Sequence, residues 1–425
     1  MLGALAACGG KSASADAGAA TGGNTSAPPP ATTAAPAADA GGTNAGGGTT
    51  SGTIRIVSSL PLTGSANAQT STTVNGVKLA IDEVGGKVGD FTITYESWDD
   101  ASAKKGDWDP EVEAANADKA VNDKDVMAYI GTYNSGAAMI SMPVLNKAGI
   151  LMVSPANTYP GLTKPGMGEA HEPGTYRPSG KITYYRVVPA DDIQGAVGAK
   201  WMQKMGAKSV YVLHDNGLYG KGVATVFQQT AEDLGLKVVA FEAIDPKAQE
   251  YKSLMTKIKE SNPDFVYYGG TTQTNAGQLV KDFVAVGLTG KIMLPDGCYE
   301  EAFIQAAGAD NANDRVFLTF GGLPPDKLTG KGADFVKAYK AKFGGDPEAY
   351  AVYGYVAAKV VLEAIKIAGK KDRDAIAAAA AQVKFEDSAL GKFSFTADGD
   401  TTMTMMSGNT VKAGKFEFVT LLGTE

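Results

Sequence analysis

From Thr53 onward, short apolar runs alternate with longer stretches of helical periodicity, and this alternation constrains the fold more than any other feature. The runs are rich in β-branched and aromatic residues, which is typical of strands. Residues 70–84, 111–122 and 136–147 space their apolar side chains by three and four, as amphipathic helices do. We therefore expect an α/β fold with parallel sheets and helices on both faces. The predicted strands are "TIRIVSSL", "FTITYESW", "VMAYIG", "ILMVSP", "SVYVLHD", "KVVAFEA", "DFVYYGG", "KIMLPDG" and "RVFLTF".

Two strand regions also resemble each other. Residues 125–135 read "DVMAYIGTYNS" and residues 264–274 read "DFVYYGGTTQT", with Gly-Thr and a later hydroxyl at the same offsets. Any two strand–helix–strand units share some likeness, but this coincidence favours two lobes of similar build. A length of 425 residues also exceeds what one hydrophobic core usually organises.

Small polar residues follow the strands of both predicted lobes. Ligands of open parallel sheets bind beyond the carboxyl ends of the strands, so two facing lobes would share one polar cleft. Ser135 is predicted at a helix start that favours a carboxylate, and Ala156 and Thr158, which follow the next strand, are expected to add backbone and hydroxyl hydrogen bonds. Asp296 is a lone acid at a strand end and suits an ammonium group. The alternatives are that Ser135 only caps its helix and that Asp296 only makes a turn.

Composition and motifs exclude several classes of function. The net charge is −7 and no Lys/Arg-rich run occurs, which argues against nucleic acid as a partner. Two histidines are too few for a zinc site without several converging carboxylates. The sequence has no nucleophile elbow, phosphate-binding loop or dinucleotide-binding loop, so we expect no enzyme and no cofactor. No apolar run reaches the length of about 18 residues that a membrane helix needs.

The N-terminal region has the composition of a tether. Leu5 to Cys8 read "LAAC", which resembles a bacterial lipobox, so Cys8 is the predicted lipid attachment site. Residues 1–8 are interpreted as the remnant of a truncated signal peptide, because a signal needs a longer apolar region. Residues 9–52 are almost entirely Ala, Gly, Ser, Thr, Pro and Asn. Such a segment is predicted to be a disordered tether.

Together these features resemble the branched-chain amino acid-binding family of ABC transporter substrate-binding proteins, which have the type I periplasmic-binding fold. The resemblance covers about residues 53–422. It rests on "SLPLTG" (59–64), "GILMVSPANT" (149–158), "VVPADDIQG" (187–195), "HDNGLYGKG" (214–222), "PDFVYYGG" (263–270) and "MLPDG" (293–297).

The resemblance implies two Rossmann-like lobes with parallel-sheet cores, joined by a three-strand hinge. The N-terminal lobe would comprise residues 53–188 and 321–396, and the C-terminal lobe residues 189–320 and 397–425.

The resemblance also implies roles for individual residues. Ser135, Ala156 and Thr158 match the positions that hold the α-carboxylate and amino groups of the ligand. Asp296 matches the acid that pairs with the α-ammonium group, and Tyr219 matches an aromatic residue that packs on the ligand.

Two departures from the leucine-binding pattern concern the ligand's side chain. Gln69 and Thr271 stand where leucine binders carry tyrosines, which would make the pocket wider and more polar. Tyr133 and Asn134 could rebuild part of that wall. The expected ligand is therefore a small amino acid or a related amide rather than a branched aliphatic one.

The expected protein is an extracytoplasmic, lipid-anchored, monomeric solute-binding protein that delivers its ligand to an ABC permease driven by a separate ATPase. It would act at the outer face of the cell membrane, or in the periplasm of a two-membrane envelope. One alternative is a ligand sensor for a signalling partner, and another is an amide-processing enzyme on the same scaffold.

Three further segments have simpler interpretations. Residues 159–182 are predicted to be an added loop on the surface, and Met-rich residues 402–406 to pack a lobe. Cys298 is interpreted as a small buried residue, with a reactive thiol as the alternative, and Trp98 to Asp100 as rim residues.

Overall fold

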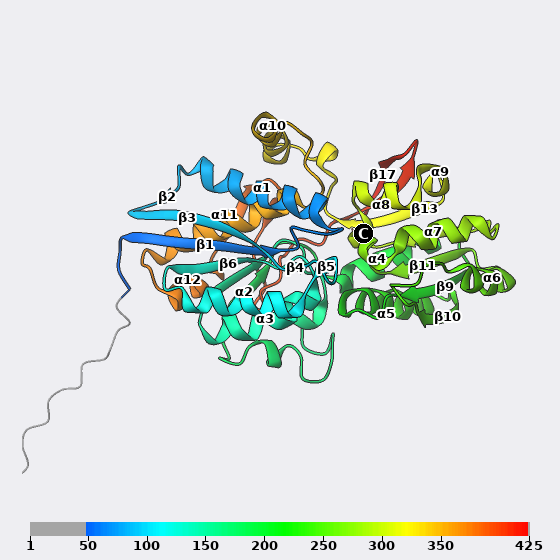
Figure 1. The fold of residues 1–425 in the computed structure, drawn as a ribbon, viewed down its shortest axis with the longest axis horizontal. Helices are drawn as coiled ribbons and strands as arrows, with labels where there is room; N and C mark the ends of the chain where they lie inside the picture. The colour runs from blue at the N-terminus through cyan, green and yellow to red at the C-terminus, as the bar shows by residue number, and fades with distance from the viewer. Residues whose placement is uncertain (1–47, 424–425) are drawn as a thin grey trace, which may run out of the picture. The chain divides into compact units, whose positions relative to one another are not determined.

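Two β-sheets organise residues 48–423, the part of the chain that the computed structural model describes (Figure 1). The first sheet has six strands, all parallel except for the edge strand β2, which pairs antiparallel with β3. Its spatial order is β2 (Lys87–Val88), β3 (Phe91–Asp99), β1 (Gly52–Leu60), β6 (Val126–Gly131), β7 (Leu151–Ser154) and β8 (Tyr184–Arg186).

The second sheet has seven strands and contains a parallel core. Two antiparallel strands complete it at the side of β13. Its order is β10 (Lys237–Ala243), β9 (Ser209–His214), β11 (Phe265–Gly269), β12 (Lys291–Leu294), β13 (Val316–Gly321), β16 (Met406–Lys412) and β17 (Lys415–Leu422). The predicted strands and the α/β fold are confirmed.

Helices cover both faces of each sheet (Figure 1). On the first sheet, α1 packs against α11 on one face and α2 against α3 on the other. On the second sheet, α4 packs against α5 and α7 against α8. The helices at the first sheet are α1 (Asn67–Glu83), α2 (Pro110–Asn122), α3 (Ser135–Lys147), α10 (Lys331–Phe343), α11 (Ala351–Ala368) and α12 (Arg373–Ala380). Those at the second are α4 (Asp191–Lys204), α5 (Leu218–Asp233), α6 (Lys252–Ser261), α7 (Ala276–Ala285), α8 (Glu301–Ala307) and α9 (Ala309–Ala312).

Short elements complete the described chain. Two small hairpins pair β4 (Ala101–Ser102) with β5 (Asp107–Trp108) and β14 (Phe385–Ser388) with β15 (Gly391–Phe393). Single 3₁₀ turns are η1 (Pro160–Leu162), η2 (Gly174–Tyr176), η3 (Thr272–Thr274), η4 (Asp296–Cys298) and η5 (Pro325–Lys327).

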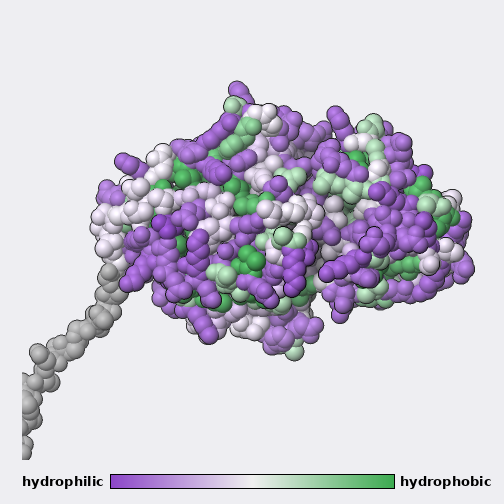
Figure 2. All heavy atoms as spheres, in the orientation of Figure 1, coloured by the Kyte–Doolittle hydropathy of each residue, from purple (hydrophilic) through white to green (hydrophobic). Residues whose placement is uncertain are grey.

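Local sequence explains where the helices begin and which face they bury. The side chain of Asp109 accepts a hydrogen bond from the N–H of Glu111, and Pro110 occupies the first turn of α2, so this helix has a defined start. In α1, Val74, Val77 and Ile81 are buried, as their helical spacing predicts. On the face seen in Figure 2, hydrophobic residues form only small patches among hydrophilic ones. No helix within residues 48–423 has both the length and the apolar character needed to cross a membrane.

The chain passes between the two sheets three times. The crossings are residues 187–190, 322–330 and 394–405, which follow β8, β13 and β15 respectively. This is the connectivity of the type I periplasmic-binding fold that the sequence predicts. The lobe boundaries predicted at residues 188, 320 and 396 remain predictions.

The folded part begins slightly earlier than the sequence predicts. The predicted tether extends to residue 52, but the backbone oxygen of Thr49 accepts a hydrogen bond from the N–H of Lys371 at 2.7 Å, and β1 begins at Gly52. Backbone pairing needs no apolar side chain, so composition does not reveal it. Cys8, the predicted signal remnant and residues 9–47 lie outside the described residues.

A buried ion pair joins the end of β8, directly before the first crossing, to the third crossing. Arg186 is 0% exposed, and its Nε lies 2.6 Å from Oδ1 of Asp400. Its Nη1 also donates to the backbone oxygens of Asn157 at 3.1 Å and Tyr159 at 2.9 Å. Burial disfavours the charged carboxylate, but the Arg186 and Lys164 cations together lower the pKa of Asp400 below its usual value. The pair therefore holds the start of the 157–163 segment against both crossings.

The prediction that residues 159–182 decorate the surface holds for residues 165–171 and 178–181, which are exposed, but is wrong for the buried part of the segment. Tyr159, Leu162 and Tyr176 are buried in the core, and the Tyr159 hydroxyl donates to Oε2 of the buried Glu172 at 2.8 Å. Lys164 reaches the start of α4, where its Nζ lies 2.6 Å from Asp192. The Pro- and Gly-rich composition suggested a surface loop, but the buried Glu172 is a hydrogen-bonding centre that only the folded chain reveals.

Asp400→Asn is expected to lower the free energy of unfolding by about 3–5 kcal/mol, because it leaves the Arg186 charge buried without its partner. Asp400 has a lowered pKa, so the stabilisation it provides should be lost as the pH falls through that folded-state pKa. Urea unfolding at pH 7 measures the effect. The matched control is Asp374→Asn, which breaks the exposed Lys181–Asp374 pair and should cost no more than about 1 kcal/mol. Equal losses in the two variants would contradict this account.

Candidate ligand-binding site

The predicted site residues come together around a small cavity between the ends of the two sheets. The cavity has a volume of about 30 Å³. Its walls come from loops after β6 and β7 on one side and from segments after β9, β11 and β12 on the other. The lining residues are Tyr133, Asn134, Ser135, Ala156, Tyr219, Thr271, Asp296, Gly297 and Tyr350. Seven of the nine residues predicted for the site are among them, whereas Gln69 and Thr158 are not.

Ser135 lies at the first-sheet side of this cavity with a hydroxyl that is suited to donate. It is the first residue of α3, and its Oγ accepts hydrogen bonds from the N–H groups of Thr158 and Tyr159, each at 3.3 Å. A serine hydroxyl has two acceptor positions and one proton. With both acceptor positions used, the remaining proton favours an acceptor such as a carboxylate, which the positive end of the helix also favours.

The backbone donor expected from Ala156 is already engaged. Its N–H donates to Oγ of Ser154 at 3.1 Å, so this group is satisfied within the protein. Ser154 also binds the N–H of Asn157 at 2.8 Å, which makes the "SPANT" segment a compact turn. Ala156 therefore contributes its surface to the cavity, and Thr158 contributes indirectly, by holding Ser135.

Asp296 faces the cavity from the second-sheet side as a buried carboxylate. It is 3% exposed, and its Oδ1 accepts from the Tyr219 hydroxyl at 2.5 Å and from Nε2 of Gln194 at 2.9 Å. Its Oδ2 accepts from the Tyr350 hydroxyl. Burial raises the pKa of Asp296, and the two tyrosine hydrogen bonds counteract this only in part. Within residues 48–423, no ion pair involves Asp296, so its charge is balanced by dipoles alone.

A second buried carboxylate lies near Asp296. Asp191, the first residue of α4, is 0% exposed. Burial, followed by repulsion from Asp296, raises the pKa of Asp191 well above its ordinary value. A cation near these two acids would relieve both effects, which fits an ammonium group as the ligand's contribution.

Gln69 holds the cavity wall instead of lining it. Its Oε1 accepts from the N–H of Tyr350 at 3.1 Å, and its Nε2 donates to the backbone oxygen of Tyr299 at 3.3 Å. Gln69 therefore ties α1 to a segment of the second sheet and orients Tyr350. Thr271 lines the cavity, and its hydroxyl also accepts from the N–H of Thr274 at 3.2 Å.

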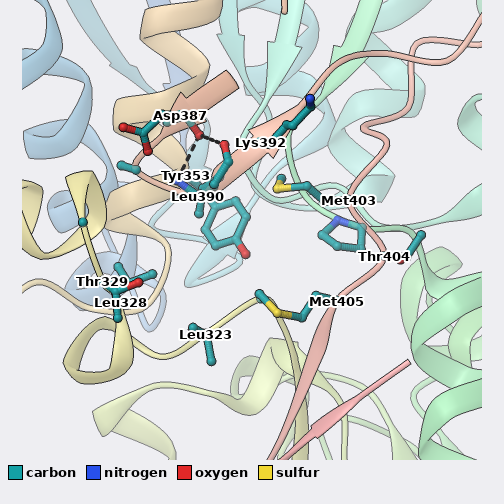
Figure 3. Close-up of a pocket in the computed structure, with 16 residues that line it drawn as sticks. Leu323, Leu328, Thr329, Tyr353, Asp387, Leu390, Lys392, Met403, Thr404 and Met405 are labelled. Carbon is teal, nitrogen blue, oxygen red and sulfur yellow. Dashed lines mark hydrogen bonds between the residues drawn. The ribbon is translucent and has the colours of Figure 1, made fainter. Parts of the chain in front are cut away.

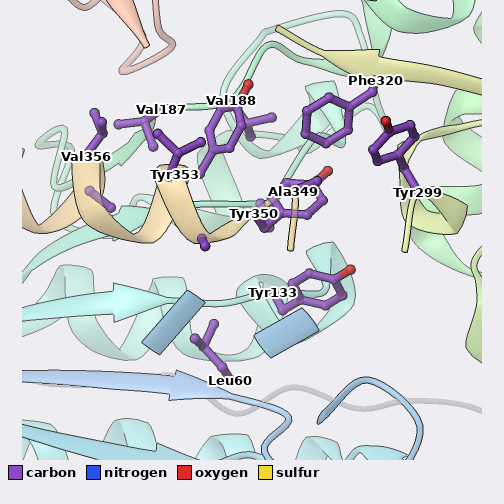
Figure 4. Close-up of a cluster of buried hydrophobic side chains, with 14 of the residues drawn as sticks. Leu60, Tyr133, Val187, Val188, Tyr299, Phe320, Ala349, Tyr350, Tyr353 and Val356 are labelled. Atoms are coloured by element: carbon purple, nitrogen blue, oxygen red, sulfur yellow. The ribbon is translucent and has the colours of Figure 1, made fainter. Parts of the chain in front are cut away.

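Tyr133 and Tyr350, which line the cavity, belong to a cluster of packed aromatic rings (Figure 4). Tyr133 meets Tyr350 edge-on with ring centroids 5.6 Å apart, and Phe320 meets Tyr350 edge-on at 5.4 Å. Tyr299 stacks on Phe320 at 4.9 Å. The rings come from both sheets, so the cluster is completed only when the two sheets lie together.

Sequence reasoning missed Tyr350, Gly297 and Gln194. Tyr350 belongs to the tyrosine-rich stretch "AYAVYGY", whose helical spacing indicates core packing rather than a site. Gln194 lies in the quoted motif "VVPADDIQG", which offered a signal.

Cys298 is fully buried, and burial raises the pKa of its thiol well above the usual value, in agreement with the prediction of a buried residue. Trp98 and Asp100 are also buried, so their interpretation as rim residues is wrong.

Further acids surround the cavity. Burial raises the pKa of Glu300 to about 7, although Gln273 donates to its Oε1 at 2.8 Å. Burial likewise raises the pKa of Glu348 to about 7 and that of Asp107 to about 6. All three carboxylates act on Tyr133, whose pKa is raised first by its own burial and then by their charges and that of Asp296. The surroundings of the cavity are therefore acidic.

Comparison with known proteins assigns a family to this arrangement. The family model described as "Periplasmic binding protein" matches residues 53–415. The "Leu/Ile/Val-binding protein BraC3" of Rhizobium johnstonii is 31% identical over 360 residues, which cover 84% of this chain and 90% of that protein. The "Leucine-, isoleucine-, valine-, threonine-, and alanine-binding protein" of Pseudomonas aeruginosa is 28% identical over 352 residues, covering 82% and 87%.

Solved structures agree with the fold. The crystal structure of a leucine-binding protein from Thermotoga maritima has a TM-score of 0.77 and 25% identity, covering 87% of this chain and 99% of that one. A solute-binding protein from Rhodopseudomonas palustris in complex with p-hydroxybenzoic acid has a TM-score of 0.75 at 20% identity, covering 87% and 96%, and supports the fold alone.

The raised pKa of Glu300 predicts how stability depends on pH. An acid whose pKa is about 7 in the folded state and about 4.3 when unfolded favours folding when protonated, so stability should fall as the pH rises from about 4.5 to 7. Glu300→Gln removes this contribution, and its unfolding temperature should fall less over that window. Glu348 and Asp107 also have raised pKa values, so the unfolding temperature of Glu300→Gln should still fall to some extent with pH. The exposed Glu386→Gln serves as control, and an identical slope in the wild type and Glu300→Gln would refute the assignment.

Proposed function

This chain belongs to the periplasmic binding protein family, and from that premise we propose that it is an extracytoplasmic solute-binding protein of an ABC importer. It captures a small amino acid or a related amide. Its family and structural neighbours are binding proteins rather than enzymes, so recognition is the function that the fold supports.

One observation carries the proposal: Ser135 and Asp296 line the same cavity from opposite sheets. The Ser135 hydroxyl, at the positive end of α3, is suited to the negative end of a zwitterion. Asp296, a buried carboxylate without an ion-pair partner among the described residues, is suited to the positive end. A ligand with both charges a few atoms apart satisfies both groups at once, which a simple amine or a simple acid does not.

Capture proceeds by relative movement of two lobes built on the two sheets. A cavity of about 30 Å³ is far smaller than the roughly 300–1,000 Å³ of small-molecule sites, so an amino acid enters only if the walls move apart. The three crossings are the segments where such a movement occurs. A ligand that contacts both sides stabilises the closed arrangement, because it makes contacts there that the open arrangement lacks.

The wall chemistry favours a small ligand. Tyr133 and Tyr350 pack edge-on against each other beside Asp296 and limit the length of the ligand's side chain. One relative, named for binding leucine, isoleucine, valine, threonine and alanine, supports an α-amino acid, and Thr271 adds a polar contact.

The remaining partners follow from this role. The chain delivers its ligand to a membrane permease powered by a separate ATPase, acts as a monomer, and is held at the membrane by a lipid on Cys8. Intact mass measurement of natively expressed protein tests the lipid on Cys8.

Asp296→Asn is expected to weaken amino acid binding about 10- to 100-fold, because it removes a charge-assisted bond that contributes about 1.5–3 kcal/mol. Calorimetry against the twenty amino acids and short amides identifies the ligand and measures the loss. Asp310→Asn, which changes an exposed acid in α9, should bind like the wild type. Unchanged affinity in a folded Asp296→Asn protein would overturn the site, and binding of no amino acid or amide by the wild type would overturn the function.

A further inference from the structure

A much larger cavity lies where the three crossings meet (Figure 3). It has a volume of about 430 Å³ and shares no lining residue with the cavity at Asp296. Pro189 comes from the first crossing, Leu323 from the second, and Met403 and Met405 from the third (Figure 3). The end of the second crossing (Leu328 to Gly330), Tyr353 of α11 and the β14–β15 hairpin close the remaining sides. We call this space the hinge cavity.

The walls of the hinge cavity are mainly apolar. Five apolar side chains, each half-buried, border it together with the ring of Tyr353: Leu323, Leu328, Leu390, Met403 and Met405. Methionine side chains are flexible and polarisable and adapt to ligands of different shapes. The prediction that Met-rich residues 402–406 only pack a lobe is therefore incomplete, because Met403 and Met405 border this cavity while Met406 is buried in the second-sheet core.

Each charged side chain at the edge of the hinge cavity forms an ion pair with a residue outside the cavity. Asp387 lies 3.5 Å from Nζ of Lys331, and Lys392 lies 2.6 Å from Glu386. Neither side chain leaves an unpaired charge for a ligand, and both are largely exposed. Tyr353 is only 1% exposed and its hydroxyl donates to the backbone oxygen of Gly321, whereas the exposed hydroxyls of Thr329 and Thr404 also border the cavity and can accept a hydrogen bond.

We propose that the hinge cavity is a second binding site, for a neutral and mainly apolar small molecule with a single hydrogen-bond donor. Its volume falls in the range of sites for small ligands, about 300–1,000 Å³, and it lies between structural units, where such sites are common. An apolar ring fits the leucine and methionine walls, and its donor fits the hydroxyl oxygens of Thr329 and Thr404.

The hinge cavity is also coupled to amino acid capture. Because its walls come from all three crossings, any movement of one sheet relative to the other changes its shape. A molecule that fits one arrangement better than the other shifts the balance between them and changes amino acid affinity. This coupling rests on the proposed function, whereas the existence of the second site does not.

The probe for the test is indole, a neutral ring with one N–H donor. Saturation-transfer NMR on the full chain should show transfer to indole at millimolar concentration. Leu390→Trp fills the cavity from the hairpin, without altering a crossing, and should abolish the transfer. Met403→Trp fills it from another wall and provides a second variant should the first not fold. Leu421→Trp, at an exposed leucine on β17, is the matched control and should retain the transfer.

Two outcomes overturn the site: no transfer to the wild type, or equal transfer to both folded filling variants and the control. Coupling is tested by calorimetry with the amino acid that the wild type binds. The affinity of the wild type for that amino acid should change by about fivefold or more at saturating indole. An unchanged affinity overturns the coupling. Asp296→Asn should still bind indole, so a failure of the proposed function is distinguishable from a failure of the second site.

Discussion

A carboxylate buried between two sheets is the constraint on which this site depends. Asp296 is almost without solvent and has no ion-pair partner in the described chain, so its charge is tolerable only if donors surround it. Two of the donors, Tyr219 in α5 and Gln194 in α4, lie at the same sheet as Asp296. The third, Tyr350, lies at the start of α11, which covers the other sheet. The hydrogen bonds that stabilise the acid therefore also link the two halves across the ligand position.

The Ser135 end of the site depends on a series of contacts that begins at a residue far away in the sequence. Asp400, in the third crossing, holds Arg186, and Arg186 holds the backbone on both sides of Thr158. The N–H groups of Thr158 and Tyr159 then fill the acceptor positions of Ser135. A buried ion pair at the hinge thus fixes the direction in which a hydroxyl in the cleft donates its proton.

Much of this organisation could be predicted from local patterns, but the contacts that complete it could not. Strand and helix positions follow from periodicity, and strand ends marked by glycine and hydroxyl residues place Ser135, Thr271 and Asp296 near one another. Tyr350 escaped detection because its spacing suits a core helix, and its role depends on an acid that is distant in sequence. The N–H of Ala156 was misjudged because the side chain that binds it lies only two residues earlier, in a turn whose geometry the sequence does not specify.

The buried thiol of Cys298 gives the described part of the chain a practical property. It is the sole cysteine within residues 48–423, is free, and lies beyond the reach of solvent. Thiolates, not thiols, are the reactive species, and burial keeps this group protonated. Maleimide dyes would thus attach selectively to cysteines engineered on the surface of each sheet's helices, so fluorescence transfer could follow the distance between the halves in real time.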